Sequence, residues 1–300
     1  MSEPTRRPLD LQGFWLMFGL AMLFGANNVL IKLGNQGLQP AFFAGTRSVV
    51  AFLALAGWMI WRRIPARWDL WRPGLLMGLL FAAEFLFLFL ALDNTNVVRA
   101  SSIFYAMPIW LSLAAHFLFP GERLTPVRFL GFLMGFGGVV LTFAGRADVT
   151  EAGNIWGDLA ALVAGMSWAA IVVVSRKSKM GMAHPETQIA WQLAVSGVIL
   201  CAMAPLFAGP LVRDFDAFQA LIFMIQALGV AATGFVMWFW LLGRYPASTL
   251  ASFSFLTPVL SALLGWLLLG EPVSWVTPIA LALLVAGLVL INRRPKTTKP

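Results

Sequence analysis

The chain has 300 residues, of which 60% are hydrophobic and 11% charged, with a mean hydropathy of +0.82 and a formal net charge of +8. Soluble domains carry about 25% charged residues, so this composition excludes an ordinary water-soluble fold. Apolar stretches of roughly 18 or more residues are long enough to cross a bilayer as helices. A transmembrane β-barrel would require alternating polar and apolar residues, and stretches such as LALLVAGLVLI (281–291) exclude that alternative.

Ten apolar segments of helix length follow one another along the chain, separated by short connections rich in Pro, Gly, Asn and charged residues. They cover roughly residues 13–33, 40–61, 73–92, 97–119, 126–144, 155–175, 185–208, 217–241, 247–269 and 272–292. The first segment continues into Asn27 and Lys32 and lacks a small-residue cleavage site, which favours a retained span over a signal peptide. We therefore predict an all-α integral membrane protein with ten transmembrane helices.

Lysine and arginine residues gather at the N-terminus and in every second connection. These residues are Arg6, Arg7, Arg62, Arg63, Arg67, Arg72, Arg123, Arg128, Arg176, Lys177, Lys179, Arg244, Arg293, Arg294, Lys296 and Lys299. The opposite connections contain Lys32, Arg99, Arg146 and Arg213. Because cytoplasmic connections carry the basic excess, we expect a multi-pass protein of the bacterial inner membrane with both termini in the cytoplasm. The net charge is then an orientation signal, and no nucleic-acid partner is expected.

The second half of the chain repeats the first. The stretch YAMPIWLSLAAHFLFPGE (105–122) is matched by FLTPVLSALLGWLLLGE (255–271), and GGVVL (137–141) is matched by AGLVL (286–290). Each half contains five spans, and an odd number forces the second copy into the membrane in the opposite orientation. We expect two inverted-topology five-helix repeats, residues 1–147 and 148–300, around a central cavity. Secondary transporters that work by alternating access are built in this way.

These features resemble the drug/metabolite transporter superfamily, in its ten-span form with two EamA-type repeats. The resemblance rests on LFGANNVLIK (23–32), Arg47 early in the second span, Pro108 with Gly121-Glu122, and Pro258 with Gly270-Glu271. Within the superfamily the chain is similar to YddG-type exporters of aromatic amino acids. The second half departs from the pattern because Gln192 stands where the first half has Arg47.

Ionisable side chains near the middle of a span are costly, by about 2.5–3.5 kcal/mol on insertion scales, so they indicate a cavity or an internal partner. Glu84 is the clearest case. We expect it to contact a substrate amine or to carry a coupling proton; the alternative is a structural pair with Arg47. Arg47 and Lys32 are interpreted as gating or structural residues, with binding of a substrate carboxylate as the alternative for Arg47.

Further substrate-binding candidates lie on polar stripes or deep in the spans. These candidates are Asn28, Tyr105, Gln192, Gln226, Trp168 and Trp238. The two tryptophans suit stacking on a flat or cationic ligand, and the polar residues suit a hydrated route. Helix packing and interhelical hydrogen bonding are the alternatives for each of them.

The repeated motif contributes four more candidates, which we interpret as gating or structural. Pro108 and Pro258 each remove a helix hydrogen bond, so both are expected to kink their spans and act as matched hinges. Glu122 and Glu271 close the motif at the span ends, where we expect them to hold loops in place and not to contact substrate.

We therefore expect a secondary transporter that exports small organic metabolites, chiefly amino acids with aromatic or other apolar side chains. A multidrug or nucleobase/nucleoside exporter is the alternative within the superfamily, and a channel the alternative outside it. An enzyme is disfavoured, because the spans offer one central acid and no HExxH motif. No cofactor or metal is expected. The expected partners are a small-molecule substrate and the lipid bilayer, with proton coupling left open. A monomer is favoured over a dimer.

Overall fold

The structure is a computed structural model that describes residues 10–119, 125–144, 154–245, 253 and 256–292. Over these residues the regular structure is helical, apart from one isolated antiparallel bridge between Leu38 and Val212. Within the described part of the chain, seven helices are long and apolar enough to cross a membrane, and three shorter apolar helices accompany them. The prediction of an all-α membrane protein is thereby confirmed.

The described residues of the first half form six α-helices. They are α1 (Leu11–Gly37), α2 (Pro40–Arg62), α3 (Trp71–Asn94), α4 (Val97–Phe104), α5 (Met107–Leu118) and α6 (Pro126–Ala144). The second half contains α7 (Ile155–Lys177), α8 (Pro185–Met203), α9 (Ala217–Met224), the π-helical segment η4 (Ile225–Gly234), α10 (Phe235–Arg244), α12 (Leu256–Leu269) and α13 (Val276–Asn292). Short 3₁₀ turns lie at Trp68–Leu70, Lys179–Met182 and Ala204–Leu206.

Local sequence signals account for where the helices begin. Pro40 and Pro185 open α2 and α8, where a missing N–H costs nothing because the first turn has no internal acceptor for it. Asn96 caps α4 by accepting a hydrogen bond from the Arg99 amide at 2.9 Å, and Asn154 caps α7 in the same way. These caps satisfy amide groups that would otherwise lie unpaired at the membrane boundary.

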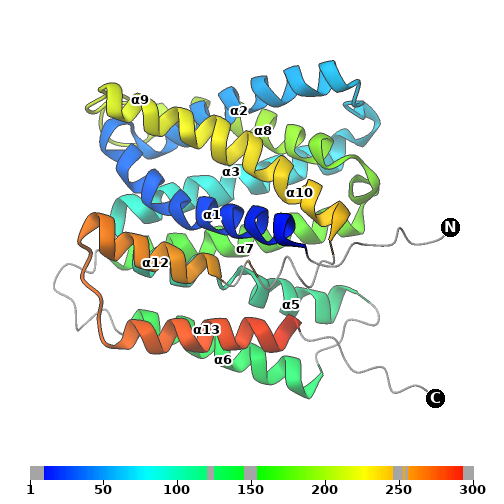
Figure 1. Cartoon of the computed structure of the whole chain (residues 1–300). Helices are drawn as coiled ribbons and strands as arrows, with labels where there is room; N and C mark the ends of the chain where they lie inside the picture. Colours follow the sequence, from blue (N-terminus) through cyan, green and yellow to red (C-terminus); the bar gives the residue numbers. More distant parts are fainter. Residues whose placement is uncertain (1–9, 120–124, 145–153, 246–252, 254–255, 293–300) are drawn as a thin grey trace, which may run out of the picture.

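The two halves pack against each other as an inverted repeat requires. Repeat-equivalent helices lie together: α2 packs along α8, and α6 packs along α13. Contacts between helices that are not equivalent also occur in pairs related by the repeat. Helix α1 packs on α12 of the second half, and α7 packs on α4 and α5 of the first. In Figure 1, α6 and α13 lie side by side at the bottom of the view, and α12 crosses between them and α1.

The bundle has two ends, which we name by a residue at each. Helices α1 and α3 end, and α4 begins, at the Glu271 end, on the left in Figure 1. Helix α1 begins, and α2, α5 and α13 end, at the opposite end, which we call the Arg62 end. Both described chain ends, Asp10 and Asn292, therefore belong to the Arg62 end, where the sequence concentrates its basic residues.

The fourth span differs from the expected single kinked helix. Helix α4 ends at Phe104, and α5 starts at Met107, so Tyr105 and Ala106 form a turn between two separate helices. Pro108 lies in the first turn of α5, because its ring would clash with the carbonyl group four residues earlier, that of Phe104, in a continuous helix. Pro258 is buried near the start of the described part of α12, and Glu122 lies outside the described residues.

The closest approach between α6 and α13 depends on glycine. A Cβ atom at Gly287 would lie 2.5 Å from the Gly131 carbonyl oxygen and 2.6 Å from the Gly135 amide nitrogen, both immobile backbone atoms. We expect Gly287→Ala to lower the free energy of unfolding by about 1–3 kcal/mol through forced separation of the helices. Gly137→Ala on α6 is the control, because nothing lies within 4 Å of its Cβ position. Equal melting temperatures of the two variants in detergent would contradict this account.

Candidate functional site

Polar side chains from both halves form a buried cluster inside the bundle, which we call the central polar cluster. Its members are Asn27 and Asn28 of α1, Arg47 of α2, Glu84 of α3, Ser101 of α4, Gln226 of η4 and Ser261 of α12. Each member is at most 8% exposed. Buried polar groups need hydrogen-bond partners, and the pattern of satisfied and unsatisfied atoms in this cluster indicates what it can bind.

One side of the cluster is linked by side-chain hydrogen bonds, with only Oδ1 of Asn27 left buried and without a partner among the described residues. The hydroxyl groups of Ser101 and Ser261 lie 2.6 Å apart, which joins α4 of the first half to α12 of the second. The side-chain amide of Asn28 donates to the Ser101 hydroxyl at 2.8 Å, and that of Asn27 donates to the Asn28 oxygen at 3.3 Å. Four polar side chains are thus arranged in a single row across the interface between the halves.

Gln226 extends this row to Arg47. Its amide nitrogen donates to the Asn27 carbonyl at 3.0 Å, and its amide oxygen accepts from Nη1 of Arg47 at 3.0 Å. Gln226 lies in the π-helical segment Ile225–Gly234, a backbone form that is rare and often found at functional sites. Because Gln226 contacts both α1 and α2, it fixes the guanidinium of Arg47 from the opposite half.

The charged members of the cluster are incompletely satisfied. The Arg47 guanidinium lies over the Phe85 ring, 4.0 Å from its centroid, and 5.2 Å from that of Phe89. Its Nε and Nη2 atoms, and Oε2 of Glu84, are buried without a hydrogen-bond partner among the described residues. A buried charge without a partner is strongly unfavourable, so these atoms point to a polar ligand or water.

The depth of the cluster fits a binding site within the membrane. Glu84 lies ten residues from the last residue of α3, and Arg47 seven residues from the first of α2, both counted from the Glu271 end. At 1.5 Å per helical residue these positions are about 10–15 Å from that end. The hydrocarbon core is about 30 Å thick, so the charges lie near its middle.

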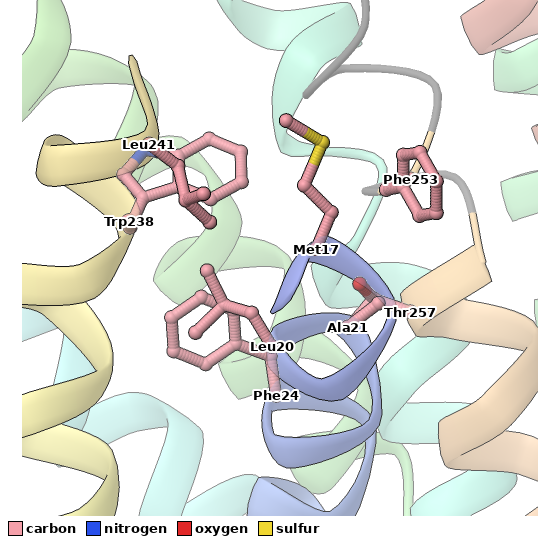
Figure 2. Close-up of a pocket in the computed structure, with 8 residues that line it drawn as sticks. All are labelled: Met17, Leu20, Ala21, Phe24, Trp238, Leu241, Phe253 and Thr257. Atoms are coloured by element: carbon pink, nitrogen blue, oxygen red, sulfur yellow. The ribbon is translucent and has the colours of Figure 1, made fainter. Parts of the chain in front are cut away.

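An apolar pocket opens on the Arg62 side of the cluster. It is lined by Met17, Leu20, Ala21, Phe24, Trp238, Leu241, Phe253 and Thr257. Figure 2 shows the α1 side chains between Trp238 and Leu241 on one side and Phe253 and Thr257 on the other. Ring contacts link Phe24 to Trp238 at 6.4 Å between centroids, so this pocket offers aromatic surface with little hydrogen bonding.

The Glu271 end is closed by contacts between the halves. The Glu271 carboxylate accepts hydrogen bonds from the amides of Val97 and Val98, at 2.8 and 3.1 Å, and lies 3.4 Å from the Lys32 amine. Lys32 also donates to the Thr95 carbonyl at 2.7 Å. A carboxylate from the second half therefore caps the positively polarised N-terminus of α4 in the first half.

Two more ion pairs cross between the halves at this end. Arg99 and Asp158 are paired at 2.6 Å with almost no solvent exposure, and Arg213 and Asp93 at 2.9 Å with partial exposure. The Leu38–Val212 bridge joins the loops alongside them. In the conformation described, this end is thus held shut, and the cluster members Asn28, Arg47 and Gln226 have no exposed surface.

The structure brings some of the predicted site residues together and separates others. Asn28, Arg47, Glu84 and Gln226 belong to the cluster. The Tyr105 hydroxyl donates to the Phe24 carbonyl at 3.0 Å beside the apolar pocket, which Trp238 lines. Gln192 donates to Gln188 within its own helix, and Trp168 is half-buried on α7; no hydrogen bond or ring contact given by the described residues joins either to the cluster.

Sequence reasoning missed Ser261 and Asp158. Asp158 is an acid in the first turn of an apolar span, and Arg99 is a base in the first turn of another span that begins at the same end. Their position at the same membrane face was a signal that they could pair, although Lys32, Arg213, Asp93 and Glu271 also lie at that face. Among the described residues, no group of three or more His, Cys, Asp or Glu side chains is arranged to hold a metal.

An all-helical membrane bundle with a polar centre shared by two inverted halves has the architecture of a membrane transporter. The sequence agrees with this class, because the model of the EamA-like transporter family matches residues 11–144 and 155–293. The chain belongs to the EamA-like transporter family. The two matched segments are the two halves packed against each other in Figure 1.

Relatives support the same assignment. An uncharacterized transporter of Archaeoglobus fulgidus is 28% identical over 93% of this chain and 97% of its own length. A probable amino-acid metabolite efflux pump of Escherichia coli is 25% identical, with 90% and 91% covered. A solved crystal structure is 23% identical with a TM-score of 0.66, covering 93% of this chain and 97% of the other, and at that identity it supports the fold alone.

Proposed function

We propose that the protein is a secondary transporter that exports amino acids with aromatic or other apolar side chains across a bacterial inner membrane. The observation that carries this proposal is the pair of opposite charges, Arg47 and Glu84, buried at mid-membrane depth with unsatisfied atoms. Opposite charges suit a substrate that carries both signs. The E. coli relative named as a probable amino-acid metabolite efflux pump supports the same substrate class.

Alternating access is the proposed mechanism. The contacts that close the Glu271 end join one half to the other, so rocking of the halves would break them together. The basic residues at the Arg62 end support a cytoplasmic position for that end and for both termini. Substrate would then enter beside the apolar pocket and leave at the Glu271 end.

A multidrug exporter is the second candidate, favoured by the aromatic surface of the apolar pocket. Uptake into proteoliposomes separates the two candidates. The panel contains labelled amino acids, nucleobases and a cationic dye, with and without a pH gradient. We expect saturable uptake of apolar amino acids above empty vesicles, and stimulation by the gradient if protons are coupled. Uptake of the dye or of nucleobases without any amino acid would overturn the proposed substrate class.

A further inference from the structure

The unpartnered edge of the Arg47 guanidinium, formed by Nε and Nη2, can be compared with the same edge of other arginines in this protein. At Arg99 the Nε and Nη2 atoms together hold the Asp158 carboxylate, and at Arg67 the same two atoms hold Asp69. At Arg47 this edge is buried and without a partner, while the third nitrogen, Nη1, is used by Gln226. Arg213 instead holds Asp93 through Nη1 and Nη2. The edge left open in the central polar cluster is therefore the one that binds the carboxylate at Arg99 and Arg67.

Glu84 does not fill that edge. Arg47 and Glu84 are near enough to interact electrostatically, yet the described residues contain no ion pair between them. Oε2 of Glu84 is itself buried and unsatisfied. A purely structural pair would bring the two groups into contact, because only close and well-aligned contact can offset the cost of burying both charges. Two separated charges, each with free atoms, instead match a ligand that carries an anion and a cation.

Aromatic rings connect this position to the apolar pocket. Phe85, which supports Arg47, contacts Phe81 at 4.5 Å between ring centroids, and Phe81 contacts Phe235 at 6.4 Å. Phe235 contacts Phe24 at 5.7 Å, and Phe24 lines the pocket in Figure 2. An apolar side chain attached to the zwitterion would therefore meet ring surface on the Arg62 side of the charges.

We infer that Arg47 and Glu84 form a zwitterion site, in which the Nε–Nη2 edge of Arg47 binds the substrate carboxylate and Glu84 binds the substrate ammonium group. Gln226 is a positioning residue that holds Nη1 of Arg47 and so orients the binding edge. This inference rests on the proposed function for its substrate class, but it makes a separate claim about which charge each residue recognises. Ligands that lack either charge leave one buried group unpaired and bind more weakly.

The test compares three probes on the purified full-length protein in detergent. Labelled L-phenylalanine is displaced by phenethylamine, which lacks the carboxylate, and by 3-phenylpropionate, which lacks the amine. For the wild-type protein we expect each analogue to bind about 10–100-fold more weakly than phenylalanine. This arm needs no substitution, so it decides the inference even if a variant fails to fold.

Two variants assign the charges to residues. Glu84→Gln is expected to lower the affinity for phenylalanine and for phenethylamine about tenfold or more, and to leave the affinity for 3-phenylpropionate unchanged. Arg47→Lys, which loses the two-atom edge, is expected to lower the affinity for phenylalanine and for 3-phenylpropionate. The affinity for phenethylamine should stay unchanged. Arg67→Lys is the matched control, because it alters the same kind of edge at an exposed position, and all three affinities should stay at wild-type values.

The outcomes separate this inference from the proposed function. The zwitterion site would be overturned if phenylalanine and either analogue bound with equal affinity. It would also be overturned if both variants lowered the affinities for all three probes equally, or if no probe bound. Amino-acid uptake into proteoliposomes would still support the proposed function in each of those cases. Conversely, the charge-specific pattern without any amino-acid transport would support the site and overturn the transport proposal.

Discussion

Replacing Asp158 with asparagine is expected to lower the free energy of unfolding by about 3–5 kcal/mol, because it leaves the buried Arg99 guanidinium without a counter-charge. Asp158 has a fully buried side chain and accepts from Arg99 through both oxygens, at 2.6 and 3.4 Å. The Thr95 hydroxyl donates to the same carboxylate at 3.2 Å. Titration with sodium dodecyl sulfate in mixed micelles, followed by circular dichroism, measures the loss.

The control for Asp158 is a pair with similar geometry and a different environment. Arg67 holds Asp69 through two bonds of 2.9 Å, but both side chains are well exposed. Exposed ion pairs contribute little to stability, so Asp69→Asn should unfold at the same sodium dodecyl sulfate concentration as the wild-type protein. An apolar replacement of both Arg99 and Asp158 should recover part of the lost stability, since no charge is then left unpaired. Wild-type stability of Asp158→Asn would contradict the buried-pair account.

The spans were predictable from the sequence because their signals are local. An apolar run of the right length, ended by proline, glycine or asparagine, marks a helix whatever its neighbours are. The third span, expected at 73–92, is observed at Trp71–Asn94. The inverted repeat could also be read locally, from two matched motifs and an odd number of spans.

Backbone irregularities within spans were not predictable. The turn at Tyr105–Ala106 and the π-helical segment at Ile225–Gly234 lie inside continuous apolar runs. Pro108 marked its neighbourhood as irregular but not the exact place of the break. For η4 the sequence has no proline or other comparable mark, and the segment packs against α2 and α1, which are distant in sequence.

The candidate site was predictable in its charged members and in Gln226, but not in Ser261 or in the connections between its members. Glu84, Arg47 and Gln226 are conspicuous because polar residues are rare in apolar spans. Which atoms remain free follows only from the fold, because Gln226 meets Arg47 across 179 positions of sequence. Gln192, at the position equivalent to Arg47, forms its hydrogen bond within α8, so the repeat gave no guide to its role.

Glu271→Gln is expected to loosen the N-terminus of α4. Gly270 adopts a left-handed conformation, φ 63°, which ends α12 and turns the next residue back toward the first half. There the Glu271 carboxylate accepts from the Val97 and Val98 amides and lies 3.4 Å from Lys32. Glutamine keeps one acceptor oxygen but loses the charge and the second acceptor. The lost hydrogen bond to a charged group corresponds to about 10–100-fold in the local opening equilibrium.

Hydrogen–deuterium exchange with mass spectrometry measures that opening directly. Peptides that contain Val97 and Val98 should exchange about 10–100-fold faster in Glu271→Gln, while peptides from α8 should keep their protection. Glu186→Gln, in the first turn of α8 at the Arg62 end, is the control and should leave α4 unchanged. Because Glu271 and α4 belong to opposite halves, faster exchange confined to α4 would identify this contact as one that must break when the Glu271 end opens. Unchanged exchange at α4 would mean that the neighbouring pairs, Arg99 with Asp158 and Arg213 with Asp93, hold this end closed without it.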